Sequence, residues 1–91
     1  MLVTFCYDIP NDRRRCHVAR LLDGVGRRVQ YSVFEGDLDD KTLANVIERV
    51  KRVIHPTEDS VRVYRICATC KKQTVLLGIG ELTEKPEVII L

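Results

Sequence analysis

The first part of the chain changes from a strand pattern to a helix pattern. Residues 2–9 (LVTFCYDI) are apolar on both faces of an extended chain, as in a central strand covered on each side. Pro10 ends this run, and Asn11 or Asp12 can cap a helix. The apolar spacing i, i+3, i+4, i+7 then appears at Val18, Leu21, Leu22 and Val25. The pattern predicts a strand over 2–9 and a helix over 12–25.

The middle of the chain repeats this order. Residues 27–34 (RRVQYSVF) alternate between two faces, which predicts a second strand. Glu35-Gly36 predicts a bulge or bend that can split this strand in two. A second helix is expected to begin after Asp39 or Asp40 as its cap and to end near His55-Pro56. Its apolar stripe consists of Leu43, Val46, Ile47, Val50 and Ile54.

Two further apolar runs follow the second helix. Residues 60–67 (SVRVYRIC) and 74–79 (TVLLGI) predict two strands, and the loop 68–72 between them favours a hairpin. A polar connector, 81–86, leads to residues 87–91, which resemble a short strand without a polar face. If the second strand splits, the order becomes β-α-β-β-α-β. This order predicts an α+β fold, the ferredoxin-like sandwich, with an antiparallel sheet and two helices on one face.

Length and composition predict one globular domain. The chain has 91 residues, of which 45% are hydrophobic and 31% charged, and no linker divides it. We therefore expect a single domain over 1–91, with a core over 1–80 and a connector and C-terminal strand over 81–91. Membrane spans need roughly 20 apolar residues, far more than any run here, and the N-terminus does not resemble a signal peptide. These features predict a cytoplasmic protein with no membrane partner and with reduced cysteines.

Asp8 is the first candidate for chemistry, because it ends an apolar strand directly before a proline and a basic helix. A carboxylate in this place must be compensated by a cation, by hydrogen bonds or by water. One interpretation is a local cap on the turn at residues 10–12; the other is a metal ligand. Mg²⁺ usually takes one or two carboxylates plus water and phosphate. A metal site would therefore need a second Asp8 across a two-fold axis.

Basic and aromatic side chains follow Asp8 closely. The net charge is only +2, from fifteen Lys and Arg against thirteen Asp and Glu, but arginines gather in Arg13, Arg14, Arg15, Arg27 and Arg28. At the start of a helix they can bind phosphate together with the helix dipole, or they can form a solvated helix face. The nearby aromatic residues Tyr7, Tyr31 and Phe34 can stack on bases or pack in the core.

Cys67 and Cys70 form a CxxC pair. A tetrahedral zinc site would need Cys6 and Cys16 to converge on them from a strand and a helix. The other interpretation is a pair of bystander or oxidisable thiols.

Several segments resemble the small CRISPR-associated adaptation proteins of the "Cas two" family. The resemblance is carried by Tyr7-Asp8-Ile9 at the end of the first strand, by Asp12-Arg13-Arg14-Arg15 at the start of the helix, and above all by RVQYSVFEG over residues 28–36. It spans nearly the full chain.

The resemblance implies a ferredoxin-like homodimer that cuts RNA or DNA with Mg²⁺ (or Mn²⁺) and acts with the CRISPR integrase in acquiring spacers. Asp8 matches the family's metal and catalytic aspartate. The positions that the family associates with nucleic-acid cleavage or binding are matched by Tyr7, Arg15, Arg28 and Phe34. Residues 88–91 resemble a C-terminal strand that adds to the partner subunit's sheet. His17 stands where some relatives carry a further basic residue.

Two functions remain open at this point. The chain is a metal-dependent endonuclease with paired Asp8 carboxylates, or it is a non-catalytic dimeric scaffold that binds DNA between integrase subunits. A ferredoxin-like sensor or metal carrier is a third class, which the RVQYSVFEG segment disfavours.

Overall fold

The computed structural model describes residues 1–82, and the predicted strand over 87–91 lies outside them. The four strands are β1 (Leu2–Asp8), β2 (Arg27–Gln30), β3 (Val33–Asp37) and β4 (Ser60–Ile66). They form one antiparallel sheet in the order β2-β3-β1-β4. The helices are α1 (Asp12–Asp23), α2 (Asp40–Val53) and α3 (Ala68–Lys72).

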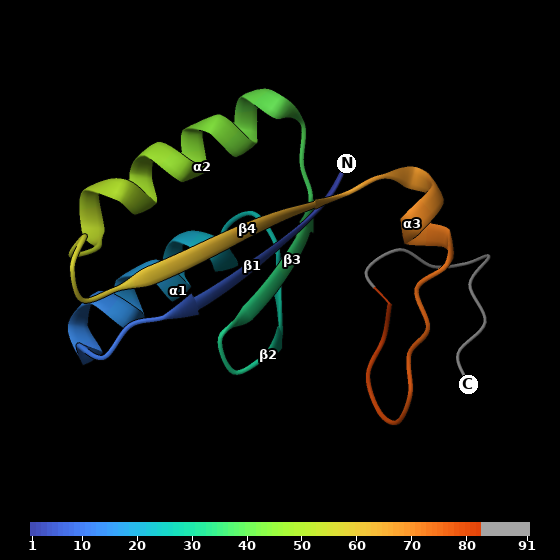
Figure 1. Ribbon diagram of the computed structural model, residues 1–91, viewed down its shortest axis with the longest axis horizontal. Helices are drawn as coiled ribbons and strands as arrows, with labels where there is room; N and C mark the ends of the chain where they lie inside the picture. The colour runs from blue at the N-terminus through green and yellow to red at the C-terminus, as the bar shows by residue number, and fades with distance from the viewer. Residues whose placement is uncertain (83–91) are drawn as a thin grey trace.

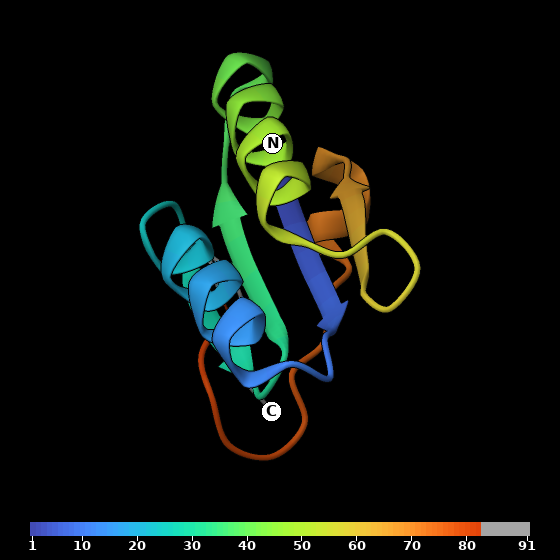
Figure 2. The ribbon, with the colours of Figure 1, turned by 90° about the vertical axis from the view of Figure 1, so that its left-hand side faces the viewer.

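Figure 1 shows this order along the chain, and Figure 2 shows α1 and α2 on the same face of the sheet. The predicted α+β, ferredoxin-like sandwich is confirmed.

The two long helices begin where their caps were predicted. The side chain of Asn11 accepts a hydrogen bond from the Arg14 backbone N–H at 2.9 Å, and that of Asp39 accepts one from the Thr42 N–H at 2.7 Å. Each cap satisfies a backbone N–H that has no partner inside the helix. Among the residues that the structure describes, no helix is long and apolar enough to cross a membrane.

The core lies between the sheet and the two long helices. Alternate residues of β1 point toward the helices, so that Val3, Phe5 and Tyr7 are buried there. The remaining buried members of this core are Ile9, Val18, Leu22, Phe34, Leu38, Leu43, Val46 and Val50. Burial of one such side chain contributes about 1.5–3 kcal/mol. Because every second residue of β1 is committed to this core, Asp8 faces the other side of the sheet.

The second predicted strand is split, but not at the predicted place. The break falls in a turn at Tyr31 and Ser32, and β3 continues through Gly36. The expected bend at Glu35-Gly36 is therefore wrong. A Cβ atom on Gly36 would lie 2.6 Å from the carbonyl oxygen of Val25, so glycine here allows the α1–β2 connection to approach β3 closely.

The predicted hairpin after α2 is also wrong. Residues 68–72 form the one-turn helix α3 instead of a loop, and residues 74–79 form no strand. The Lys71 ammonium lies 3.8 Å from the Asp37 carboxylate, which holds α3 at the end of β3. The segment 74–79 leaves Val75, Leu77 and Ile79 at 61%, 78% and 99% exposure. Its apolar pattern favours an extended chain, but no strand of residues 1–82 pairs with it.

Candidate functional site

Asp8 is the last residue of β1, where the strand pairs with Ser60 at the start of β4. Its side chain is exposed and makes no hydrogen bond or ion pair with any other residue of 1–82. The turn after β1 is capped by Asn11 instead, so the interpretation of Asp8 as a local cap is wrong. Within the described part of the chain, Asp8 is a carboxylate that the fold leaves available.

Arg15 fixes the backbone directly after Asp8. Its guanidinium donates hydrogen bonds to the carbonyl oxygens of Ile9 at 3.0 Å and Pro10 at 3.4 Å, and it also bonds the carboxylate of Asp12. The hydrogen bond to Asp12 raises the pKa of Arg15, which keeps the guanidinium charged. Of the predicted nucleic-acid-binding residues, Arg15 is therefore the one that shapes the turn beside Asp8.

Arg14 lies in an ion-pair network that connects α1 to the α2–β4 loop. Its Nε donates to Asp59 Oδ2 at 2.7 Å, and its Nη2 donates to Asp59 Oδ1 at 3.1 Å and to Glu58 Oε1 at 3.0 Å. The Asp59 side chain has no exposed surface. The hydrogen bond from Arg14, joined by one from the His55 N–H, lowers the pKa of Asp59. Arg14 therefore stabilises the fold, because both carboxylates that accept its hydrogen bonds belong to the same chain.

The other two predicted arginines lie apart from each other. Arg13 is exposed at the start of α1 and makes no hydrogen bond or ion pair with the described residues. Arg28 lies on the edge strand β2, which β3 separates from β1, and its guanidinium carbon is 5.2 Å from the centre of the Phe34 ring. Arg13 lies in the first turn of α1, which follows the end of β1 that carries Asp8, whereas Arg28 lies two strands away from β1. Figure 1 shows α1 beginning at this end of β1.

The two predicted aromatic contacts are core residues. Tyr7 and Phe34 are 7% and 1% exposed, and their rings stack with centroids 6.3 Å apart. A ring so covered presents no face to a nucleic-acid base, because stacking needs an open face. Of the two interpretations for these side chains, packing in the core is the one that the structure supports.

Comparison with known proteins identifies the family. The family model described as "CRISPR associated protein Cas2" matches residues 1–74, a range that contains every described helix and strand. The chain belongs to the Cas2 family.

Relatives and solved structures extend the match over the chain. A protein from Chloroflexus aurantiacus named CRISPR-associated endoribonuclease Cas2 3 is 41% identical, covering 94% of this chain and 92% of its own. A CRISPR-associated endonuclease Cas2 2 from Thermus thermophilus is 40% identical, covering 99% and 96%. The structure of Streptococcus pyogenes Cas2 has a TM-score of 0.75 at 30% identity, covering 86% and 100%. A chain of a partial Cas6-RT-Cas1–Cas2 complex has a TM-score of 0.75 at 26% identity, covering 99% and 98%.

On this Cas2 fold, Arg62 is a cation near Asp8 that sequence reasoning missed. It lies opposite Cys6 in the β1–β4 pairing, so it shares the helix-free face with Asp8 and is its diagonal neighbour across the two strands. Its side chain is exposed and donates to the Tyr64 hydroxyl at 3.3 Å. The alternating pattern SVRVYRI, which begins at Ser60, predicts that Arg62 lies on the polar face of this strand. That pattern does not show which residue of β1 lies beside Arg62, because this depends on the pairing register of β1 and β4.

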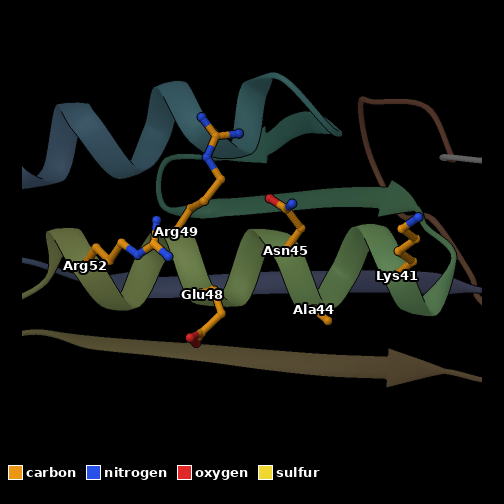
Figure 3. A pocket seen from close by; sticks show the side chains of 6 residues that line it. All are labelled: Lys41, Ala44, Asn45, Glu48, Arg49 and Arg52. Carbon is orange, nitrogen blue, oxygen red and sulfur yellow. The ribbon is translucent and has the colours of Figure 1, made fainter.

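A second polar surface of this Cas2 domain lies on α2. Figure 3 shows a shallow pocket on this helix, with Arg49 pointing toward α1. The residues that line it are Lys41, Ala44, Asn45, Glu48, Arg49 and Arg52. These side chains belong to the helical layer, whereas Asp8 faces away from that layer. The pocket is therefore separate from the candidate site around Asp8.

Proposed function

We propose that this chain is a metal-dependent endonuclease of a CRISPR system, acting on RNA or DNA as a homodimer in which two Asp8 carboxylates lie together. The single observation that carries the proposal is the state of Asp8. Its carboxylate is exposed and unpaired within residues 1–82, whereas Arg15 and Arg14 beside it are held by internal acceptors. An exposed carboxylate without an internal partner can bind a divalent cation through its oxygens.

The donor chemistry fits Mg²⁺ or Mn²⁺, but one chain supplies too few ligands. Both ions accept carboxylate oxygens, and Asp8 offers one such group per copy. Among residues 1–82 no group of three or more His, Cys, Asp or Glu side chains is placed to hold a metal ion. Asp8 of this chain and its equivalent in a second copy would hold the ion. When bound, the metal supplies neutralisation of the scissile phosphate and a more acidic water molecule.

The other residues near Asp8 would position the nucleic acid. Arg15 keeps the carbonyl oxygens of Ile9 and Pro10 in place, and this fixes the direction in which β1 ends. Arg13 and Arg62 are exposed, and a guanidinium can bind a phosphate through two parallel hydrogen bonds. Their part is to neutralise backbone phosphates on either side of the Asp8 carboxylate.

A second copy would also cover apolar surface that one copy leaves open. Val75, Leu77 and Ile79 are spaced at i, i+2 and i+4 and are more than half exposed. They would share one side of the chain if the bend at Gly78 straightened on pairing with a second copy. Burial of this side favours dimerisation by about 25 cal/mol per Å² of apolar area. A further contribution from the strand predicted over 87–91 belongs to the same proposal.

A second candidate function is supported by one comparison. A structurally similar chain belongs to a partial Cas6-RT-Cas1–Cas2 complex. We infer that this chain also acts with the CRISPR integrase during spacer acquisition. In the alternative form of the proposal it does so as a non-catalytic DNA-binding scaffold, for which the Asp8 carboxylate is dispensable.

The experiment that separates these functions compares Asp8→Asn with Asp23→Asn, a matched substitution of an exposed aspartate at the end of α1 that has no partner among the described residues. Wild type and both variants are assayed for cleavage of RNA and duplex DNA with Mg²⁺ or Mn²⁺, with EDTA as a blank, and for spacer integration with the integrase. We expect Asp8→Asn alone to lose cleavage by at least about a hundredfold. Equal cleavage by all three proteins refutes the catalytic role, and full integration by Asp8→Asn supports the scaffold.

A further inference from the structure

Two thiols meet at the junction between β4 and the segment that follows it. Cys67 precedes α3 and Cys70 lies within it, and both side chains are exposed. The Lys71 backbone N–H donates to the Cys67 carbonyl oxygen at 2.9 Å, which closes one helical turn. Residues three apart in such a turn are neighbours on the same side. The fold thus places the CxxC thiols together on an accessible surface.

We propose that Cys67 and Cys70 form a thiol–disulfide exchange site, which small-molecule disulfides such as oxidised glutathione convert to a reversible intramolecular disulfide. The two residues share one helical turn and both thiols are exposed, so rotation of the side chains brings the sulfur atoms toward each other. Disulfides require Cβ atoms about 3.5–4.5 Å apart, whereas Cβ atoms three residues apart in a helix are about 5–6 Å apart. Closing the bond therefore also needs a small backbone shift at Cys67, which lies at the N-cap outside the regular helix. The chemistry is independent of the proposed nuclease activity.

The two thiols differ in acidity, which gives each a role. The backbone N–H of Cys70 and then its thiol lower the pKa of Cys67, because both stabilise a sulfur anion. The same contact raises the pKa of Cys70, so Cys67 is the more acidic of the two thiols. Cys67 is therefore the attacking thiolate, and Cys70 is the second thiol that resolves the intermediate.

The exchange balances without any further reactant. The Cys67 thiolate attacks one sulfur of oxidised glutathione, forms a mixed disulfide and releases one glutathione thiolate. Cys70 loses its proton to that thiolate or to water, and its sulfur attacks the Cys67 sulfur. The new Cys67–Cys70 bond releases the second glutathione. The protein loses two electrons and two protons, and the small disulfide gains them.

The other two cysteines are placed differently. Cys16 is exposed on α1 without a second thiol beside it, and Cys6 is half-buried in β1, paired with Arg62 and Val33 of the neighbouring strands. They do not converge on Cys67 and Cys70, since the described residues contain no cluster of three potential metal ligands. The four-cysteine zinc interpretation of the sequence is therefore wrong for residues 1–82. Cys16 provides an internal control for an exposed thiol without a partner.

The test uses the full chain in reduced and oxidised glutathione mixtures at neutral pH. Wild type, Cys70→Ser and Cys16→Ser are quenched with acid, alkylated and analysed by intact mass and peptide mapping. We expect wild type and Cys16→Ser to show two thiols that escape alkylation and carry no glutathione, with the bond mapped to Cys67–Cys70. Cys70→Ser should instead accumulate one glutathione on Cys67, formed at least about tenfold faster than on Cys16.

Three results would overturn this proposal. The first is wild type that carries glutathione adducts at every ratio without forming the Cys67–Cys70 bond. The second is Cys70→Ser that shows the same two unalkylated thiols as wild type, and the third is Cys16 that reacts as fast as Cys67. Circular dichroism of each variant checks that its fold is retained, and Cys67→Ser provides a second variant in which both the adduct and the bond should be absent.

Discussion

Residues 1–66 and residues 67–82 differ in how far their apolar side chains are buried. In the first region the apolar faces of four strands and two helices are buried against each other, with Phe5, Leu22 and Phe34 at 2% exposure or less. In the second region a one-turn helix leads to a segment whose alternate apolar residues are mostly exposed. The sandwich is thus complete at β4, and the segment after it presents surface that a single copy does not cover.

The charged side chains around the candidate site also fall into two groups, those with partners in the same chain and those without. Arg14 is used internally by Asp59 and Glu58, and Arg15 by the turn after β1. Asp8 and Arg13 have no such partners among the described residues. A charged side chain that the fold holds is part of the framework, whereas one that it leaves open is available to a ligand.

The largest contrast is expected between two leucines. Leu22→Ala removes a side chain with no exposed surface and should reduce the free energy of unfolding by about 2–5 kcal/mol. Leu77→Ala removes one that is 78% exposed and should change it by less than about 0.5 kcal/mol at low protein concentration. Urea denaturation of both variants measures this. A large loss for Leu77→Ala would mean that the segment packs into the sandwich of the same copy.

The sandwich was predictable because its patterns are local. The apolar run 2–9, which ends at Pro10, and the i, i+3, i+4 spacing after Asn11 give β1 and α1 directly, and both long helices begin at the predicted caps. The prediction of a hairpin was wrong because the apolar pattern of 74–79 indicates an extended chain but does not determine which strand pairs with it. The pairing of Arg14 with Asp59 spans 45 positions, a separation at which no short motif connects an arginine to its acceptor.

An intermediate effect is expected from Arg14→Ala. The substitution leaves the Asp59 carboxylate, which has no exposed side-chain surface, without its cation. The thermal midpoint should fall by roughly 5–10 °C. Arg13→Ala is the matched control at the next position and should shift the midpoint by less than about 2 °C. Equal shifts in a differential scanning experiment would contradict the division between framework and available arginines.

Acid should weaken the framework through the same ion pair. The pKa of Asp59 is lowered in the folded state, so its stabilising contribution is full above the ordinary aspartate pKa of about 3.9 and is lost as pH falls through the lowered value. We expect the free energy of unfolding to decrease steadily below about pH 4. The decrease should be shallower in Asp59→Asn, as measured by urea denaturation at each pH. An identical pH dependence in both proteins would remove Asp59 from the framework.

A smaller effect should distinguish the available arginines from one another. If Arg13 contacts a phosphate, Arg13→Ala should reduce the salt dependence of nucleic-acid binding by about one charge in the plot of log K against log salt. Arg49→Ala, which replaces an exposed arginine in the α2 pocket, is the control and should leave this slope unchanged. Fluorescence anisotropy with a labelled duplex at several salt concentrations gives both slopes. A reduced slope for Arg49→Ala alone would move the interface to the helical face.

The most direct test of the paired Asp8 carboxylates is the stoichiometry of Mn²⁺ binding, measured by electron paramagnetic resonance on wild type and Asp8→Asn. Two copies that hold one ion between them predict one tightly bound Mn²⁺ per two chains in wild type and none in the variant. One ion per chain, or equal binding by the two proteins, would contradict the shared site.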